Sequence, residues 1–124
     1  MLIEASRYAR PRGYLAKVAI DGSGRVGDER VILDTPHHLS YPFLLADEGT
    51  YYVLPESWEA DRLSAYRLEP ADGVLLPEHE LIVGQAIVDP TLLHRDGQWW
   101  LFCCDRHDDD NTNLYIFHAR HWRG

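Results

Sequence analysis

The sequence predicts an all-β protein made of antiparallel, four-stranded propeller-blade repeats with a period of about 48 residues. Three observations favour this partial β-propeller of about two and a half blades. The segment "SYPFLLADEGTYYVL" from Ser40 is nearly repeated as "VDPTLLHRDGQWWLF" from Val88. Each copy has a glycine-containing turn signal between two apolar runs, and no stretch has a pronounced helical pattern.

The two copies align without a gap. Pro42 matches Pro90, an offset of 48 residues. The same offset matches Leu44-Leu45 with Leu92-Leu93, Gly49 with Gly97, and Tyr51-Tyr52 with Trp99-Trp100. An acidic residue followed by glycine between β-rich runs is typical of a hairpin, because glycine adopts the positive φ of a tight turn. We therefore expect a β-hairpin in each copy, with Gly49 and Gly97 in the turns.

Both strands of each hairpin are almost continuously apolar, as in strands that are buried on both faces. A proline at the start of each first strand fits this reading, since its missing N–H interrupts no ladder there. We expect six residues of the second strands to be mostly buried: Tyr52, Val53, Leu54, Trp100, Leu101 and Phe102.

The flanking segments extend the unit to four strands in a single domain, residues 1–124. Residues 13–35 contain "GYLAKVAID" and "RVILD", expected as strands three and four of a first blade. Residues 40–84 form a complete blade, with "RLSAYRLE" and "ELIVG" as its last two strands. Residues 88–122 supply strands one to three of another blade, ending in "NLYIFHAR".

Composition limits the function classes. The net charge of −8, from 20 acidic and 12 basic residues without a basic cluster, disfavours nucleic-acid binding. No apolar run has the length of a signal peptide or a membrane span, so a cytoplasmic protein without membrane contact is expected. The adjacent Cys103 and Cys104 are interpreted as reduced packing thiols, because neighbouring cysteines do not easily reach relaxed disulfide geometry. No cofactor is predicted.

A resemblance follows from "HHLSYPFLLADEGTYYVLPES", "AIVDPTLLHRDGQWWLF" and "LYIFHARHW". These segments resemble the five-bladed β-propeller superfamily of glycoside hydrolase families 43 and 32. They are more closely similar to the propeller domain at the N-terminus of glucosamine inositolphosphorylceramide transferases and of some formyltransferase-like bacterial proteins. The resemblance covers roughly Gly13 to Trp122, which corresponds to about half of such a propeller.

Two carboxylates are the candidate catalytic residues. The resemblance implies that an Asp before a proline, at the start of an innermost strand, acts as base or nucleophile, and Asp89 in "VDPTLL" matches that position. Glu56 ends the second strand of the first copy, and blade topology places it on the same rim as Asp89. The structural alternatives are an Asp that caps the start of a strand and a Glu that only hydrogen-bonds a ligand.

Other side chains at this rim are candidate ligand-binding residues. An indole such as that of Trp58 can stack on a sugar ring, and the two adjacent histidines are expected to point to opposite faces. The acidic run from Asp105 to Asn111 lacks the glycine and distal glutamate of a calcium loop, so a solvated loop and no metal is predicted. The predicted ligand-binding residues are His37, His38, Tyr41, Trp58, Arg106 and His107.

Three functions remain open. The first is a binding module for a carbohydrate or another polar small ligand, and the second is a non-catalytic remnant of a glycosidase-like propeller. The third is a glycoside hydrolase or glycosyltransferase-related enzyme whose site is completed by oligomerisation. Incomplete blades leave open sheet edges, so a homodimer or other homo-oligomer is expected. It should bury more than about 1,000 Å², with residues 14–20 or 113–119 at its border.

Overall fold

The structure, a computed structural model, describes residues 1–7, 10–108 and 113–124. Within these ranges the regular structure is ten β-strands and one 3₁₀ turn, η1, at Trp58–Ala60. The strands are β1 (Leu2–Arg7), β2 (Arg10–Ile20), β3 (Val26–Leu33), β4 (Ser40–Asp47), β5 (Thr50–Glu56), β6 (Arg62–Leu68), β7 (Leu75–Val83), β8 (Ile87–Arg95), β9 (Gln98–Asp105) and β10 (Tyr115–Ala119). The fold is therefore all-β, as predicted, and no described helix is long and apolar enough to cross a membrane.

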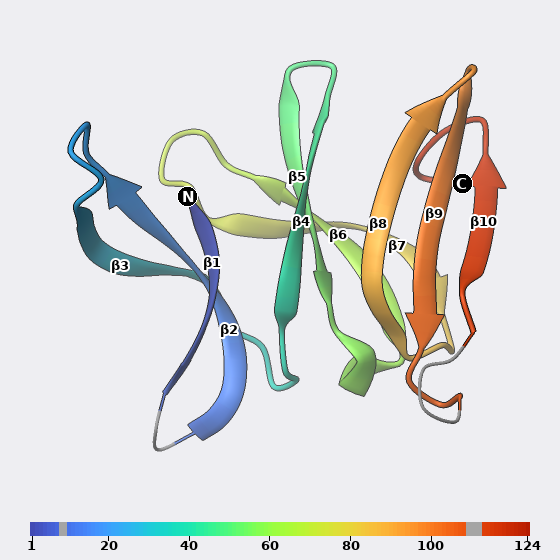
Figure 1. Ribbon diagram of the computed structural model, residues 1–124, viewed down its shortest axis with the longest axis horizontal. Helices are drawn as coiled ribbons and strands as arrows, with labels where there is room; N and C mark the ends of the chain where they lie inside the picture. Colours follow the sequence, from blue (N-terminus) through green and yellow to red (C-terminus); the bar gives the residue numbers. More distant parts are fainter. Residues whose placement is uncertain (8–9, 109–112) are drawn as a thin grey trace.

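The strands form three antiparallel sheets, which lie side by side in chain order (Figure 1). The N-terminal sheet has the order β1-β2-β3, the middle sheet β4-β5-β6-β7, and the C-terminal sheet β8-β9-β10. Strand β4 contacts β1 and β2 on one side, and β8 contacts β4, β5 and β6. The middle sheet is thus the only one of the described sheets with a neighbour on both faces.

The 48-residue period extends further towards the N-terminus than the sequence analysis expected. Strands β1, β5 and β9 begin at Leu2, Thr50 and Gln98, each 48 residues after the previous one. The N-terminal sheet therefore contains strands two to four of the unit, and the strand Leu2–Arg7 was missed. As a result β2, which contains residues 14–20, is the central strand of its sheet, and the expectation that these residues form a free edge was wrong.

The two hairpins share their backbone irregularities as well as their pattern. Both predicted glycines lie in the turns: Glu48 and Gly49 have φ of 47° and 78°, and Asp96 and Gly97 have φ of 53° and 75°. Two consecutive residues with positive φ are typical of a type I′ turn, which suits the twist of paired strands.

A β-bulge lies at the start of both first strands. The register shifts between Ser40 and Phe43 in β4 and at the matching place in β8. Tyr41 and Asp89, at equivalent positions, both have a positive φ, 41° and 52°. β-bulges redirect side chains at strand ends. Both copies of the repeat therefore have the same irregular backbone where their first strand begins.

The core consists of two clusters, one on each face of the middle sheet. On β5, Val53 faces the N-terminal sheet, whereas Tyr52 and Leu54 face the C-terminal sheet, and all three are buried. The prediction that this strand buries both faces is confirmed.

The same prediction holds only in part for β9. Leu101 faces the middle sheet and is buried, but Trp100 and Phe102 remain partly exposed. Alternation along the strand turns these two side chains to the opposite face, which no described sheet covers. For that reason both side chains are less completely buried than Leu101, although most of their surface is covered. Cys103 is buried and Cys104 half-buried, both as free thiols.

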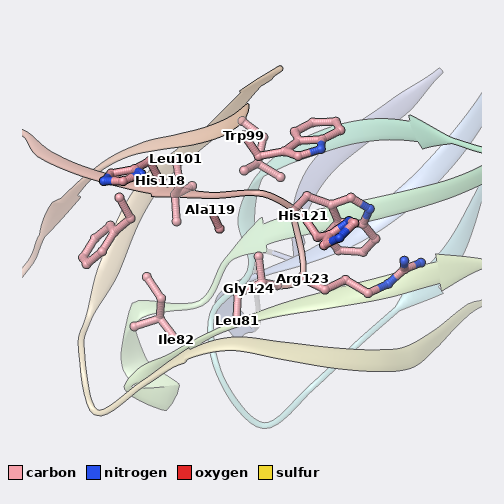
Figure 2. Close-up of a pocket in the computed structure, with 12 residues that line it drawn as sticks. Leu81, Ile82, Trp99, Leu101, His118, Ala119, His121, Arg123 and Gly124 are labelled. Carbon is pink, nitrogen blue, oxygen red and sulfur yellow. The ribbon is translucent and has the colours of Figure 1, made fainter. Parts of the chain in front are cut away.

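The C-terminal segment folds back against the middle sheet (Figure 2). Trp122 is buried in the core between the middle and C-terminal sheets, and its Nε1 donates a 2.7 Å hydrogen bond to Asp47. The Arg123 guanidinium lies 4.3 Å from the Trp122 ring centroid and donates to the Tyr52 hydroxyl at 2.7 Å. An apolar opening of about 180 Å³ remains beside this segment, between β7, β9 and β10.

Candidate functional site

Glu56 and Asp89 lie together at one end of the molecule, where β5 ends and β8 begins. The backbone N–H of Asp89 donates a 3.1 Å hydrogen bond to Glu56 Oε2. Both residues line an opening of about 360 Å³, together with Trp58, Val88 and Arg106. Blade topology alone predicted these two carboxylates on one rim, and the structure brings them together there.

The bulge in β8 presents Asp89 to this opening. A non-glycine residue with positive φ carries a modest steric cost, and Asp is among the residues that tolerate it best. Its neighbour Pro90 is fully buried, whereas Asp89 itself is exposed. Thr91 links the two hairpins next to the site, because its Oγ1 lies 3.0 Å from the Tyr41 hydroxyl.

Trp58 and Arg106 also line the opening. Trp58 begins η1, two residues after the end of β5 at Glu56, and is half-buried. The Arg106 guanidinium carbon lies 5.7 Å from the centroid of its ring. The backbone N–H of Arg106 donates to the Ala86 carbonyl at 2.8 Å, which anchors the loop that carries it. An indole, a guanidinium and two carboxylates therefore surround one solvent-accessible space.

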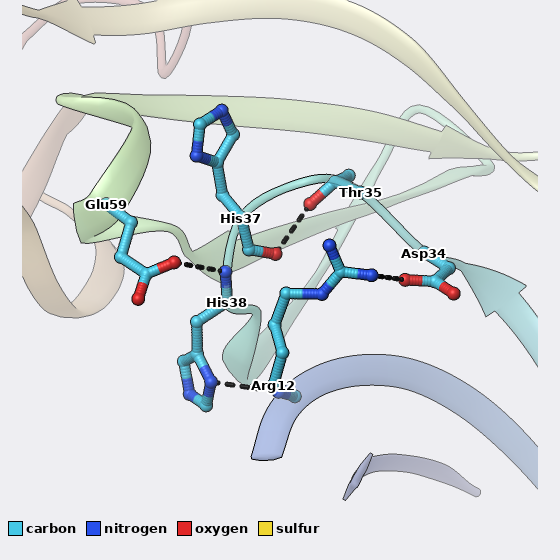
Figure 3. A network of polar contacts seen from close by, with 7 residues as sticks. Arg12, Asp34, Thr35, His37, His38 and Glu59 are labelled. Atoms are coloured by element: carbon cyan, nitrogen blue, oxygen red, sulfur yellow. Dashed lines mark hydrogen bonds and ion pairs between the residues drawn. The ribbon is translucent and has the colours of Figure 1, made fainter. Parts of the chain in front are cut away.

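The two histidines do not line this opening, contrary to the expectation that one of them would. His38 is held in a network of backbone contacts (Figure 3). Its Nδ1 accepts a 2.9 Å hydrogen bond from the Gly13 N–H, and its own N–H donates to Glu59 Oε2 at 2.8 Å. Figure 3 shows the His37 ring on the other side of the loop from the His38 ring.

The remaining predicted ligand-binding residues also lie outside the Glu56 opening. Tyr41 lines a separate shallow opening with residues 42–44. The His107 ring is exposed, with Nε2 3.6 Å from Asp61 Oδ1 and Nδ1 3.8 Å from Asp105 Oδ1. Among the described residues no group of three or more side chains is arranged to hold a metal ion. Residues 109–111 of the acidic run lie outside the described ranges.

A second polar opening was missed by the sequence analysis. It has a volume of about 280 Å³ and lies between the loop 35–39 and the middle sheet, where Ser64 and Tyr66 of β6 line it. The only available signal was a serine within the otherwise apolar pattern of "RLSAY". That serine reads as an ordinary strand residue when the sequence is considered alone.

Comparison with known proteins supports part of the resemblance. Residues 18–123 match the family model described as "Glucosamine inositolphosphorylceramide transferase 1, N-terminal". The protein of that name from Oryza sativa subsp. japonica is 33% identical over 94 residues, which are 72% of this chain and 12% of the relative. The Arabidopsis thaliana protein is 35% identical over 77 residues, 60% of this chain and 10% of the relative.

The match is therefore long in this chain and short in its relatives, of which the chain spans about one-eighth or less. No solved structure gives a significant match, so the likeness to a β-propeller stays a prediction. Because the family model covers most of the chain, the chain belongs to the family of the N-terminal domain of glucosamine inositolphosphorylceramide transferase 1.

Proposed function

We propose that this chain is a non-catalytic binding module for a carbohydrate, and that the opening around Glu56, Trp58, Asp89 and Arg106 is its ligand site. One observation carries the proposal: four side chains suited to sugar recognition surround one solvent-accessible opening. Ligand sites typically combine an apolar surface with a few polar groups that fix the orientation of the ligand.

Each group has a role in this proposal. The Trp58 indole offers an apolar face for the C–H groups of a pyranose ring, while the guanidinium of Arg106 donates to ring or hydroxyl oxygens. The carboxylates accept hydrogen bonds from sugar hydroxyls. Glu56 uses one oxygen for the Asp89 N–H, which leaves its second oxygen and both oxygens of Asp89 for the ligand.

The balance of charge favours a neutral or cationic sugar over a phosphate. Two carboxylates face one guanidinium, so the opening carries a net negative charge at neutral pH. The name of the relatives includes glucosamine, whose ammonium group would suit such a site. We therefore propose glucosamine or a related hexosamine as the ligand.

The proximity of Glu56 and Asp89 also favours a second candidate, a glycosidase-like enzyme with Asp89 as base or nucleophile. Glycoside hydrolysis requires two carboxyl groups on either side of the scissile bond. Here one of the two already accepts the backbone N–H of the other, and the opening is exposed to water. For this reason we rank catalysis below binding.

Titration of the ¹⁵N-labelled chain with glucosamine tests the proposal. We expect shifts at Trp58, Asp89 and Arg106, and a roughly tenfold loss of affinity in Trp58→Ala, as for loss of one stacking contact. Tyr51→Ala is the matched control, because Tyr51 is an exposed aromatic residue of β5 next to the Gly49 turn.

Three results would contradict the binding proposal. Unchanged affinity in Trp58→Ala would remove this opening as the site. Absence of binding to any sugar in a glycan array would favour the non-catalytic remnant. Turnover of an aryl glycoside that is lost in Asp89→Asn would establish the enzyme instead.

We also propose that the chain self-associates as a homodimer. Within the described residues, β10 pairs only with β9, whereas the equivalent strand β6 pairs with both β5 and β7. Ile116 and Phe117 of β10 are 52% and 38% exposed. In the N-terminal sheet, β1 is likewise an edge strand that pairs only with β2 among the described strands. These two edges replace residues 14–20 as the proposed border of the interface.

A further inference from the structure

The second polar opening contains a buried hydroxyl group that has no partner among the described residues. Ser64 is 9% exposed, and its side chain has no hydrogen-bond partner among the described residues. Almost all buried polar groups in native proteins are hydrogen-bonded, so an exception requires an explanation. Ser57, which also lines the opening, shows the usual situation: it is buried too, and its Oγ donates to the Arg62 carbonyl at 2.8 Å.

Alternation along β6 determines which way Ser64 faces. Leu63 and Ala65 are fully buried in the cluster shared with the C-terminal sheet. Ser64 and Tyr66 lie on the other face, towards the N-terminal sheet, where Tyr66 packs against the second cluster. Both therefore line the opening from the same strand, two residues apart.

Tyr66 adds a second hydroxyl group of the same kind. Its hydroxyl has no hydrogen-bond partner within the described part of the chain. Burial raises the pKa of Tyr66 above its ordinary value, so the phenol keeps its proton at neutral pH and can donate as well as accept. Two residues that line the opening thus carry neutral hydroxyl groups for which the described part of the chain supplies no partner.

The remaining walls are apolar or already neutralised. Pro36, Leu39 and Ala60 supply apolar surface, and His37 supplies an imidazole ring. The Arg62 guanidinium is engaged: its Nη1 donates to Glu80 Oε1 at 2.5 Å and its Nε to the Ala60 carbonyl at 3.2 Å. The described residues that line the opening therefore supply no unpaired guanidinium, ammonium or carboxylate that would select an ion.

The walls are held in place from both sides (Figure 3). The loop 35–39 is tied to β2, because the Leu39 N–H donates to the Gly13 carbonyl at 3.1 Å and the Gly13 N–H donates to His38 Nδ1. Glu59 of η1 accepts from the His38 N–H at 2.8 Å, which ties the loop to the middle sheet. A preformed opening binds a small ligand with less ordering cost than a flexible one.

We infer that this opening is a binding site for a small neutral polyhydroxylated ligand, a single sugar ring or a cyclic polyol, which hydrogen-bonds to Ser64 and Tyr66. The mixture of hydroxyl groups and small apolar surfaces matches such a molecule, and its volume of about 280 Å³ suits one ring. The site is separate from the Glu56 opening. Trp58 lines one of them and Ser57 and Ala60 line the other, so the inference does not depend on the proposed function.

A titration of the ¹⁵N-labelled chain with D-glucose, with inorganic phosphate as the charged comparison, tests the inference. We expect glucose to shift the amides of Ser64, Tyr66 and His37, and phosphate to leave them unchanged. Tyr66→Phe removes only the hydroxyl oxygen and should weaken glucose binding about three- to tenfold, the usual contribution of one hydrogen bond. Tyr51→Phe, which removes an exposed hydroxyl group, should have no effect.

Ser64→Ala gives a second readout. Because the native hydroxyl has no partner, the variant should be at least as stable as the native chain without ligand, yet it should lose the stabilisation that glucose confers. Trp58→Ala separates the two sites, since it should leave the shifts at Ser64 and Tyr66 intact. Shifts confined to Trp58, Asp89 and Arg106, no shift at all, or unchanged glucose binding in Tyr66→Phe would overturn the inference.

Discussion

The β4–β5 and β8–β9 hairpins have the same backbone but different surroundings. Both contain a bulge before a proline at the start, a left-handed residue at that bulge and a two-residue turn with positive φ. The second strand of the first hairpin is buried on both faces because sheets lie on either side of it. The second strand of the other hairpin is buried only towards the middle sheet.

The difference shows that equivalent residues of a repeated unit are buried to different extents. The extent depends on whether the unit has a neighbouring sheet on one face or on both. Leu54 and Phe102 occupy equivalent positions on the face towards the following sheet. Leu54 meets the C-terminal sheet and is fully buried, whereas Phe102 faces a side that no described sheet covers. The larger side chain is therefore the more exposed one.

The sharpest test of this comparison replaces both residues with alanine. Leu54→Ala should lower the free energy of unfolding by about 3 kcal/mol, because it leaves a cavity in a core that is packed on all sides. Phe102→Ala should lose less, about 2 kcal/mol, since part of its surface remains in water and no described sheet packs against it. Urea unfolding followed by tryptophan fluorescence measures both. Equal losses would mean that the outer face of the C-terminal sheet is covered in solution.

Gly13 lies where the N-terminal sheet meets the loop 35–39, which leads into the middle sheet. The close approach of these two segments depends on the missing side chain of Gly13. A Cβ atom at this position would overlap the Leu39 carbonyl oxygen. Gly13→Ala should therefore cost about 2 kcal/mol, as for other substitutions that strain a packed backbone. Gly27→Ala is the control, because its Cβ would meet Ala19 at an ordinary 3.6 Å. The same thermal shift in both variants would contradict a close approach at Gly13.

Cys103 offers a pH-dependent test of the shared core between the middle and C-terminal sheets. Burial, with smaller contributions from Cys104 and Asp105, raises the pKa of the Cys103 thiol to about 11. Below the pKa of an unfolded cysteine, about 8.5, the Cys103 thiol is protonated in both the folded and the unfolded state. Its contribution to the free energy of unfolding is then fully present. As the pH rises towards 11 the unfolded thiol ionises first, so stability falls.

The decrease in the free energy of unfolding at alkaline pH should be smaller in Cys103→Ala than in the native chain. Cys104→Ala should keep most of it, because Cys104 is only half-buried on the other face of β9. Unfolding curves between pH 8 and pH 11 compare the three proteins. A decline that follows Cys104 instead would place the wrong cysteine in the core.

The smallest effect on stability is expected at the open edge of β10. Ile116→Lys should change the free energy of unfolding by no more than about 0.5 kcal/mol, since the side chain is exposed. A charged residue on an edge strand opposes pairing with another strand, so the variant should be monomeric if this edge forms the proposed dimer. Light scattering of both proteins at equal concentration decides the matter. A native chain that is already monomeric would rule out the proposed dimer.

Local signals in the sequence predicted much of the fold because each acts over a few residues. The turns at Gly49 and Gly97, the paired prolines and the apolar runs of β5 and β9 were all sufficient to place hairpins. The strand Leu2–Arg7 was missed because its alternating pattern "LIEASR" has no proline and no turn signal before it. Only its 48-residue offset from β5 relates it to the repeat.

The candidate site was predicted less completely. Glu56 and Asp89 were brought to one rim by topology, since the end of one strand and the start of the next face the same way. His38 was expected beside them, but its hydrogen bonds to Gly13 and Glu59 use it to join the loop to two sheets. Such contacts join residues more than 20 positions apart, and no local pattern encodes them.

The sequence by itself determined the repeated unit, its hairpins, its turns and the two carboxylates at its rim, because these depend on backbone preferences and on alternation along a strand. Only the tertiary structure decided which apolar side chains are buried and which polar groups are left without partners. Trp100 and Phe102 are apolar residues of the kind found in a core, but they face a side that none of the described sheets covers. Ser64 resembles a surface residue, yet the loop 35–39 covers it. Burial is a property of what packs against a residue, and that depends on how the sheets are stacked.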